Sequence, residues 1–223
     1  VTNHHVVADF KSIQVMFPFT GLKMYDAHVV LWCPESDIVF LELKDTTLEI
    51  EGLKLAEKGE NSDLSSKDLL YAVGFPLGYQ NMHINVGEKT GEHFTNNGGG
   101  ESLIQHSAQL NEGNSGGALL TFDKEPVVVG VNNAIIKGYL GIDFAIPVQR
   151  IKILIHEYKT KNNVLKPVIR HPYFFGAILQ PCTSIIHRKS KTSKEGVYVS
   201  DIMKGSQAST CLEIGDILHT ING

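Results

Sequence analysis

The sequence predicts a mainly β protein with a single long helix, and three observations lead to this prediction. Short runs of β-branched and aliphatic residues recur between turn signals, which 21 glycines and 8 prolines supply. The 223 residues are 42% hydrophobic and 20% charged, as in an ordinary folded protein, so wholesale disorder is not expected. Only one stretch, after Pro147, has apolar residues at i, i+3, i+4 spacing: Val148, Ile151, Leu154, Ile155 and Tyr158.

Taken in chain order, each predicted strand has a local reason. Residues 28–31 are an extended apolar run, and residues 38–43 (IVFLEL) mix alternation with continuous burial. Residues 70–73 end at a tight turn over 74–78, whereas the polar, glycine-rich stretch 93–101 predicts a flexible surface loop. Further strands are expected over 103–106, 116–122, 126–132 and 141–146, followed by the helix over 147–159.

A polar stretch then separates two patterns, which predicts two domains. Residues 161–167 are expected to be a linker between a domain over 1–160 and a second one over 168–223. In the second pattern, strands are expected at 176–180, 196–201 and 215–218, a lysine-rich loop at 187–194 and a short helix at 206–211.

Composition and cysteine spacing argue against several functions. The net charge of −4 disfavours a nucleic-acid binder that neutralises phosphates. No apolar run approaches the ~20 residues of a membrane helix. The cysteines are few, odd in number and far apart, so neither a disulfide framework nor a zinc ribbon is indicated: Cys33, Cys182 and Cys211. Both ends read as interrupted strands, so the chain is expected to be a fragment of a longer protein.

The segment 111–120 (NEGNSGGALL) carries the strongest chemical signal. Glycines on both sides of Ser115 permit backbone angles that other residues resist. The N–H groups of Gly113 and Ser115 could therefore point into one concavity and hold the oxyanion that forms when a serine attacks a carbonyl. Taken alone, the segment fits a plain Gly-Ser turn equally well.

Two other segments supply the groups that such a serine needs. A serine hydroxyl requires a base, and residues 2–7 (TNHHVV) offer His4 and His5. Asp37 stands just before an apolar strand, where a buried carboxylate could orient an imidazole. The order His, Asp, Ser is that of chymotrypsin-type serine proteases. The spacings of 32 and 78 residues allow the first two to lie in one half of a double barrel and the serine in the other.

Five segments in this order resemble the HtrA/Deg family of serine proteases: TNHHVV, SDIVFLEL, GFPLG, IQHSAQLNEGNSGGALL and GIDFAIP. The later stretch from Gly196 to Gly223 resembles the PDZ domain that follows the protease domain in that family. The resemblance implies a chymotrypsin-like double β-barrel, with its N-terminal barrel incomplete, and a C-terminally truncated α+β PDZ domain.

The resemblance also assigns roles within the candidate site. The family pattern T-N-x-H-V makes His5 the base, with Asp37 as the orienting acid and Ser115 as the nucleophile. Gly113 and Asn114, together with the Ser115 N–H, carry over as the oxyanion loop. No cofactor and no metal are implied.

Substrate contacts follow from the same resemblance and from residue types. The wall of the side-chain pocket is expected to be aliphatic, which predicts cleavage after small or medium aliphatic residues: Leu110, Ile135, Ile136 and Ile142. Asp143 stands where the family usually has glycine, and its carboxylate is expected to point into solvent. The peptide-binding loop of the PDZ segment is expected at four positions: Phe174, Phe175, Gly176 and Ala177.

The predicted function is that of a serine endopeptidase acting on unfolded or damaged proteins in protein quality control. The alternative is a catalytically silent, chaperone-like module that binds peptides through the PDZ segment. Expected partners are unfolded or peptide substrates and copies of the same chain, in a trimer-based assembly, without nucleic acid or a membrane span in this fragment. The compartment cannot be read from the sequence, and the resemblance suggests a periplasm, a cell envelope or an organelle.

Overall fold

The structure is a computed structural model that describes residues 1–45, 47–57, 64–76, 81–94, 102–122, 124–133, 142–160, 176–182 and 196–220. The chain forms two compact units, one of residues 1–93 with 102–170 and the other of residues 94–101 with 171–223. Each unit is described by itself below. No helix among the described residues is long and apolar enough to cross a membrane.

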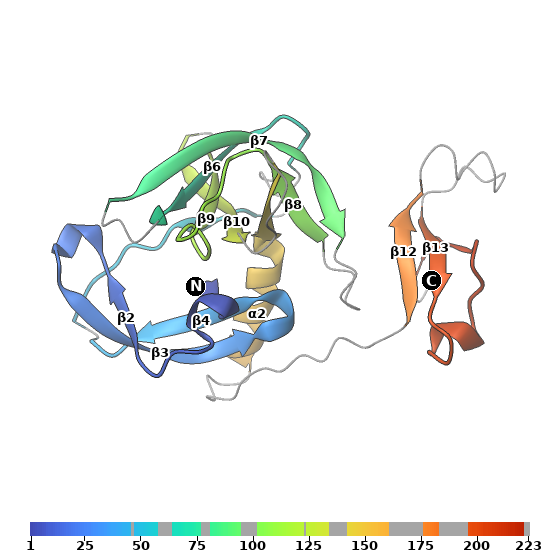
Figure 1. Ribbon diagram of the computed structural model, residues 1–223, viewed down its shortest axis with the longest axis horizontal. Coiled ribbons are helices and arrows are strands. Elements are labelled where there is room, and N and C mark those ends of the chain that lie inside the picture. The colour runs from blue at the N-terminus through green and yellow to red at the C-terminus, as the bar shows by residue number, and fades with distance from the viewer. Residues whose placement is uncertain are drawn as a thin grey trace. The chain divides into compact units, whose positions relative to one another are not determined.

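The first part of the larger unit is a four-stranded antiparallel sheet in the order β1-β4-β3-β2 (Figure 1). Its strands are β1 (Thr2–Asn3), β2 (Ile13–Met16), β3 (Met24–Cys33) and β4 (Ile38–Leu43). The expected strand over 38–43 is confirmed, and its first residues Ile38 and Val39 are completely buried. The short helix α1 (His4–Val7) follows β1 directly. The register Asn3↔Ile38 therefore fixes where α1 begins relative to β4.

The second part is a closed barrel of six strands. These are β6 (Leu69–Gly74), β7 (His83–Phe94), β8 (Ser102–His106), β9 (Ala118–Phe122), β10 (Pro126–Asn133) and β11 (Asp143–Pro147). They follow the order β11-β8-β7-β6-β9-β10, and pairing of β10 with β11 closes the ring, while β5 (Lys54–Leu55) adds to β10 in parallel. Leu70, Leu119 and Ala145 are completely buried in its core. This barrel confirms the mainly β, chymotrypsin-like prediction.

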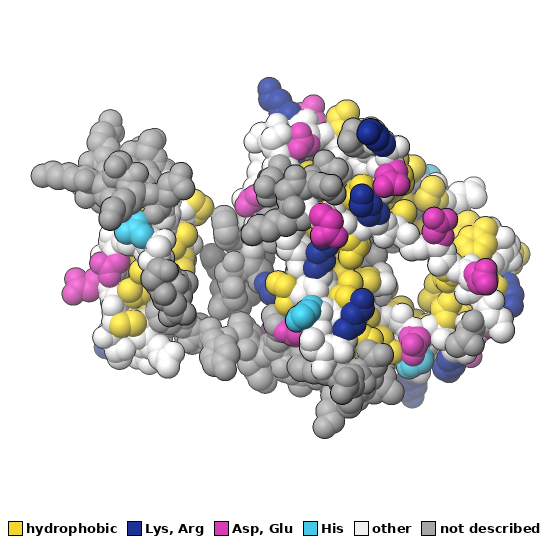
Figure 2. All heavy atoms as spheres, turned by 180° about the vertical axis from the view of Figure 1, so that it is seen from behind, with side chains coloured by type: hydrophobic (Ala, Val, Ile, Leu, Met, Phe, Trp, Pro, Cys, Tyr) yellow, Lys and Arg dark blue, Asp and Glu magenta, His cyan; other side chains and the backbone are white. Residues whose placement is uncertain are grey.

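One helix, α2 (Val148–Thr160), covers part of the barrel as the apolar spacing predicts. Val148, Ile151 and Leu154 are its buried residues, and the helix contacts β10 and β11. Pro147 is the last residue of β11 and not the first of the helix. On the face drawn in Figure 2, basic and acidic side chains alternate over the surface and do not gather into a single-sign area.

The smaller unit contains a three-stranded antiparallel sheet in the order β12-β13-β14. Its elements are β12 (Ala177–Pro181), β13 (Val197–Ile202), the 3₁₀ turn η4 (Ala208–Thr210) and β14 (Ile217–Leu218). Val199 and Ala208 are fully buried and form its core among the described residues. The strands expected at 176–180 and 196–201 are thus confirmed.

The strand prediction failed at β7. The sequence pattern predicts no element over most of this 12-residue strand, and His93, at the start of the predicted loop over 93–101, lies inside the strand. Its sequence HINVGEKTGEHF is polar and holds two glycines, which normally weaken strands. Gly87 is required by packing, because a Cβ there would lie 2.0 Å from the Ala108 backbone nitrogen. The close approach of another chain segment therefore explains a glycine that reads locally as a strand breaker.

Candidate active site

His5 and Asp37 are joined by two hydrogen bonds. The Asp37 carboxylate accepts one from His5 Nδ1 at 2.7 Å and one from the His5 backbone N–H at 2.9 Å. The carboxylate is largely covered, with a side-chain exposure of 17% against 35% for His5. Because Nδ1 donates to the carboxylate, the ring carries its proton there and Nε2 is left as an acceptor. This is the tautomer that a general base for a serine requires.

Local structure explains why Asp37 can hold His5. Asp37 follows the 3₁₀ turn η2 (Pro34–Ser36) with φ 53°, ψ 39°, a left-handed conformation that Asp tolerates better than most residues. Its backbone carbonyl accepts hydrogen bonds from the His4 N–H at 3.0 Å and from Asn3 Nδ2 at 3.1 Å. Asn3 is completely buried. The segment before His5 is therefore bound to the backbone carbonyl of Asp37, while His5 itself is bound to the Asp37 carboxylate.

A third hydrogen bond to the Asp37 carboxylate, from Asn133, was not anticipated from the sequence. Its Nδ2 lies 3.3 Å from Asp37 Oδ2. Asn133 is the last residue of β10, so this bond comes from the barrel, whereas Asp37 directly precedes β4 of the four-stranded sheet. The available signal was a polar pair, Asn132 and Asn133, ending the apolar run of β10.

The loop around Ser115 is held by its own turns and by β10. The Asn114 N–H donates to Asn111 O at 3.0 Å and the Gly117 N–H to Asn114 O at 3.1 Å. The Gly116 N–H donates to Asn132 O at 3.0 Å. Gly113 and Gly116 have φ values of 96° and 81°, so the glycine conformations expected beside the serine are present.

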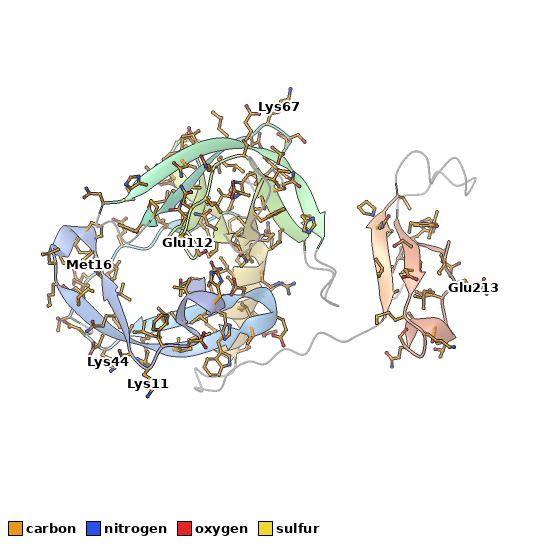
Figure 3. All side chains as sticks on the ribbon, viewed as in Figure 1. Lys11, Met16, Lys44, Lys67, Glu112 and Glu213 are labelled. Atoms are coloured by element: carbon orange, nitrogen blue, oxygen red, sulfur yellow. The ribbon has the colours of Figure 1, made fainter. Side chains whose placement is uncertain are left out.

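This loop lies against the strand that precedes His5. A Cβ added to Gly116 would lie 2.2 Å from Thr2 Oγ1 and 3.1 Å from the Asn3 backbone nitrogen. Figure 3 shows Glu112 on the side of the barrel that is turned towards β3 and β4, whereas Lys67 lies on the opposite, outer side. Three segments that are distant in the sequence thus meet: the strand before His5, the Asp37 turn and the Ser115 loop. A hydroxyl, an imidazole that accepts its proton and a carboxylate that orients the imidazole are the groups needed for acyl transfer.

Asn114 is buried within the loop. It is 1% exposed, and neither polar atom of its side chain has a hydrogen-bond partner in the described part of the chain. Its Oδ1 lies 2.5 Å from where a Cβ of Gly74 would be. Gly74 therefore allows the loop to pack closely on the end of β6.

The expected pocket residues are only partly visible. Leu110 is buried and Ile142 is half-buried against the core. Ile135 and Ile136 lie outside the described residues, as do Phe174 and Phe175 of the expected PDZ loop. Gly176 (φ 85°) and Ala177 lie at the start of β12, and the Gly176 carbonyl accepts a hydrogen bond from the Met203 N–H at 2.8 Å. Among the described residues, no three His, Cys, Asp or Glu side chains gather as a metal site.

Two further titratable groups lie inside the barrel near Leu110. His106 is completely buried, and burial lowers its pKa to about 4, with polar backbone atoms of Phe144 and Ala108 opposing that shift. Neither ring nitrogen makes a hydrogen bond of good geometry within the described residues. Burial raises the pKa of Asp143, and a hydrogen bond from the Leu110 backbone partly offsets the rise. Both groups therefore favour their neutral forms more than they would in water.

Residues 1–131 match the family described as "Trypsin-like peptidase domain". Over 229 aligned positions, the whole chain is 34% identical to a "Probable periplasmic serine endoprotease DegP-like" of Chlamydia trachomatis, and it spans 43% of that protein. It is 28% identical to "Periplasmic serine endoprotease DegP" of Escherichia coli and spans 45% of it. The chain therefore spans less than half the length of these curated relatives.

Solved structures of HtrA-type proteases share the fold. The structure titled "HtrA-type protease AlgW with tripeptide" superposes with a TM-score of 0.66 at 25% identity, covering 97% of this chain and 69% of the other. The structure titled "HtrA-type protease AlgW with decapeptide" gives 0.60 at 27% identity, covering 97% and 64%. With the matched family, these likenesses show that the chain belongs to the trypsin-like peptidase family and carries a serine protease domain of the HtrA/DegP-like type.

Proposed function

We propose that the chain is a serine endopeptidase in which Ser115, His5 and Asp37 act as nucleophile, base and orienting acid. The single observation that carries the proposal is the 2.7 Å bond between His5 Nδ1 and Asp37. It leaves His5 Nε2 as an acceptor, and the Ser115 loop packs against the strand leading to His5. The names of the relatives, serine endoproteases of the DegP type, support the same class of reaction.

The proposed reaction has two halves. Ser115 Oγ attacks the carbonyl carbon of the peptide bond while His5 Nε2 accepts its proton, and Asp37 stabilises the imidazolium. The tetrahedral intermediate collapses when His5 gives that proton to the leaving amine, which yields an acyl-enzyme. Water then attacks the acyl carbon with His5 again as the base, and Ser115 is regenerated with release of the new carboxylate.

Gly113 and Asn114 serve the same reaction through the backbone of the loop. The N–H groups of Gly113 and Ser115 are proposed to bind the developing oxyanion, and losing one such donor typically costs 10²- to 10³-fold in rate. The positive φ at Gly113 and the burial of Asn114 support this role, because both fix the path of the backbone on either side of the serine.

The proposed substrates are unfolded or damaged proteins, and the proposed role is protein quality control. The relatives named DegP are periplasmic, and the two AlgW structures contain short peptides. Extended peptide segments are the common feature of such ligands. The same proposal covers the substrates and the assembly of the whole protein, which the fold alone does not determine.

We further propose that the smaller unit is a PDZ-type peptide-binding module. Within the described residues β12 pairs only with β13, so one edge of β12 offers backbone groups to an added strand. Ile178 and Leu179 are more than one third exposed on this strand. The loop ending at Gly176 and Ala177 would then meet the end of the bound peptide.

A fluorophosphonate probe tests the proposed chemistry, because it labels only an activated serine. We expect labelling of the whole chain at Ser115 and its loss in Ser115→Ala. A matched control, Ser209→Ala, removes an exposed hydroxyl that donates to the backbone carbonyl of Ser206 and should leave labelling intact. Absence of labelling in a folded chain, together with peptide binding by the smaller unit, would instead support the catalytically silent alternative.

A further inference from the structure

Asp143 begins β11 at the end of the barrel where the Ser115 loop starts. In the antiparallel pairing of β11 with β8 it stands directly opposite His106. Opposed residues share one face of a sheet, and so do residues two positions apart along a strand. The next pair on this face is Ala145 and Ile104, and both are buried in the core. The Asp143 side chain therefore lies on the face of β11 that is turned into the barrel.

The surroundings of Asp143 differ from the solvent that was expected. The residue is half-buried, and its carboxyl lies near enough to the Leu110 backbone for that backbone to lower the carboxyl's pKa in part, against the rise caused by burial. Leu110 stands five positions before Ser115, and Ile142 directly precedes Asp143. Asp143 thus lies beside Leu110, one of the four residues expected to wall the substrate side chain. The pocket wall expected from the sequence consisted of aliphatic residues and did not include this carboxyl.

No cation of the described chain balances this carboxyl. Its electrostatic environment consists of burial and the Leu110 hydrogen bond, without a contribution from Lys or Arg. The opposing His106 is neutral near pH 7, since burial lowers its pKa to about 4. A partly buried carboxylate without a partner is costly, so a cation supplied by a ligand would be stabilised there.

We propose that Asp143 determines which substrate side chain is accepted at the cleaved bond, and that it favours Lys or Arg over Asp or Glu. This inference rests on the proposed function. The aliphatic stem of Lys or Arg packs on Leu110, while its charged end reaches the carboxylate. An acidic side chain at the same place would bring two like charges together in a partly dry environment.

Hydrolysis of matched peptides tests the proposal. A set differing only at the residue before the cleaved bond (Lys, Arg, Val or Glu) is assayed with the whole chain. We expect kcat/KM for Lys to exceed that for Glu by about 10- to 100-fold, the range of a charge-assisted hydrogen bond. In Asp143→Asn the ratio should fall to within about threefold, and in Asp143→Glu it should stay above tenfold. Asp26→Asn, an exposed carboxylate change on β3, should leave the ratio unchanged.

Other readouts separate failure of this proposal from failure of the proposed function. The fluorophosphonate probe lacks the varied side chain, so equal labelling of wild type and Asp143→Asn shows that the nucleophile is intact. Equal cleavage after Lys and Glu by a labelled wild type would overturn the role of Asp143 and leave the protease assignment standing. If the chain neither labels nor cleaves, binding of the same peptides to Ser115→Ala decides: a preference for Lys that is lost on adding Asp143→Asn supports the proposal, and no preference overturns it.

Discussion

Asp37 and the Ser115 loop, on the two sides of the candidate active site, are held in place in different ways. On the side of the four-stranded sheet, Asp37 is fixed by hydrogen bonds from Asn3, His4, His5 and Asn133. On the barrel side, the Ser115 loop is held by backbone hydrogen bonds and is also closely packed, with Gly116 against Thr2 and Gly74 against Asn114. The first side should therefore be sensitive to loss of a single polar atom, and the second to addition of a single methyl group.

The largest effect is expected for Asp37→Asn. An amide in place of the carboxylate removes the negative charge and favours the wrong His5 tautomer, so kcat should fall about 10⁴-fold. Steady-state hydrolysis of a peptide substrate measures it, with Asp26→Asn as the control. A fall of less than tenfold would contradict the orienting role of Asp37.

The next largest effect is expected for Gly116→Ala. The added methyl meets Thr2 Oγ1 and the Asn3 nitrogen, and φ is 81°, so the loop should move away from His5 and lower kcat/KM about 10²-fold. Gly21→Ala is the matched control, because Gly21 has a similar φ of 69° but nothing within 4 Å of its added Cβ. If both variants keep full activity, close packing does not hold the loop in place.

A smaller effect, on stability, is expected from His106 on the barrel side. Its folded pKa of about 4 lies below the usual 6.5, so the unfolded chain binds more protons as pH falls. The contribution of His106 to stability should decrease below pH 6.5 and level off below about pH 4, with about 2 kcal/mol lost between pH 7 and pH 5. Urea unfolding at both pH values measures this loss. His106→Gln should reduce it, whereas His28→Gln, a change at a more exposed histidine, should not.

The smallest effect is expected for Asn133→Ala. It removes one 3.3 Å hydrogen bond to Asp37 and leaves the shorter His5 bonds in place, so kcat should fall about tenfold. Gln14→Ala is the comparison, since it removes an amide bond to an exposed carboxylate on the same sheet and should not change kcat. An unchanged kcat in Asn133→Ala would show that the sheet alone orients Asp37.

The parts of the fold that could be predicted are those with local causes. The continuous apolar runs of β4 and β10 and the helical spacing of α2 appear in the structure within about two residues of their expected bounds. The strand β7 could not be predicted, because Gly87 is needed for close packing against the Ala108 backbone, 21 positions away in the chain. A requirement imposed by a distant segment leaves no local pattern.

The residues of the candidate site also divide into those that could be predicted from the sequence and those that could not. His5, Asp37 and the glycines beside Ser115 could be chosen because the chemistry needs those residue types, and the resemblance to a known protease family selected His5 rather than His4. Asn133 could not, because its contact to Asp37 depends on the docking of β10 beside the Asp37 turn, and a polar pair at a strand end does not tell which distant segment it will contact. The partly covered position of Asp143 likewise depends on strand register, which the sequence does not display.

The bond between Asn133 and Asp37 has a consequence for the timing of biosynthesis. Asn133 is translated 96 residues after the carboxylate that it contacts. Translation runs from the N-terminus, so His5 and Asp37 leave the ribosome before Ser115 and β10 do. A nascent chain that ends before β10 therefore lacks the Asn133 contact to Asp37, and the candidate active site is complete only once β10 has been made.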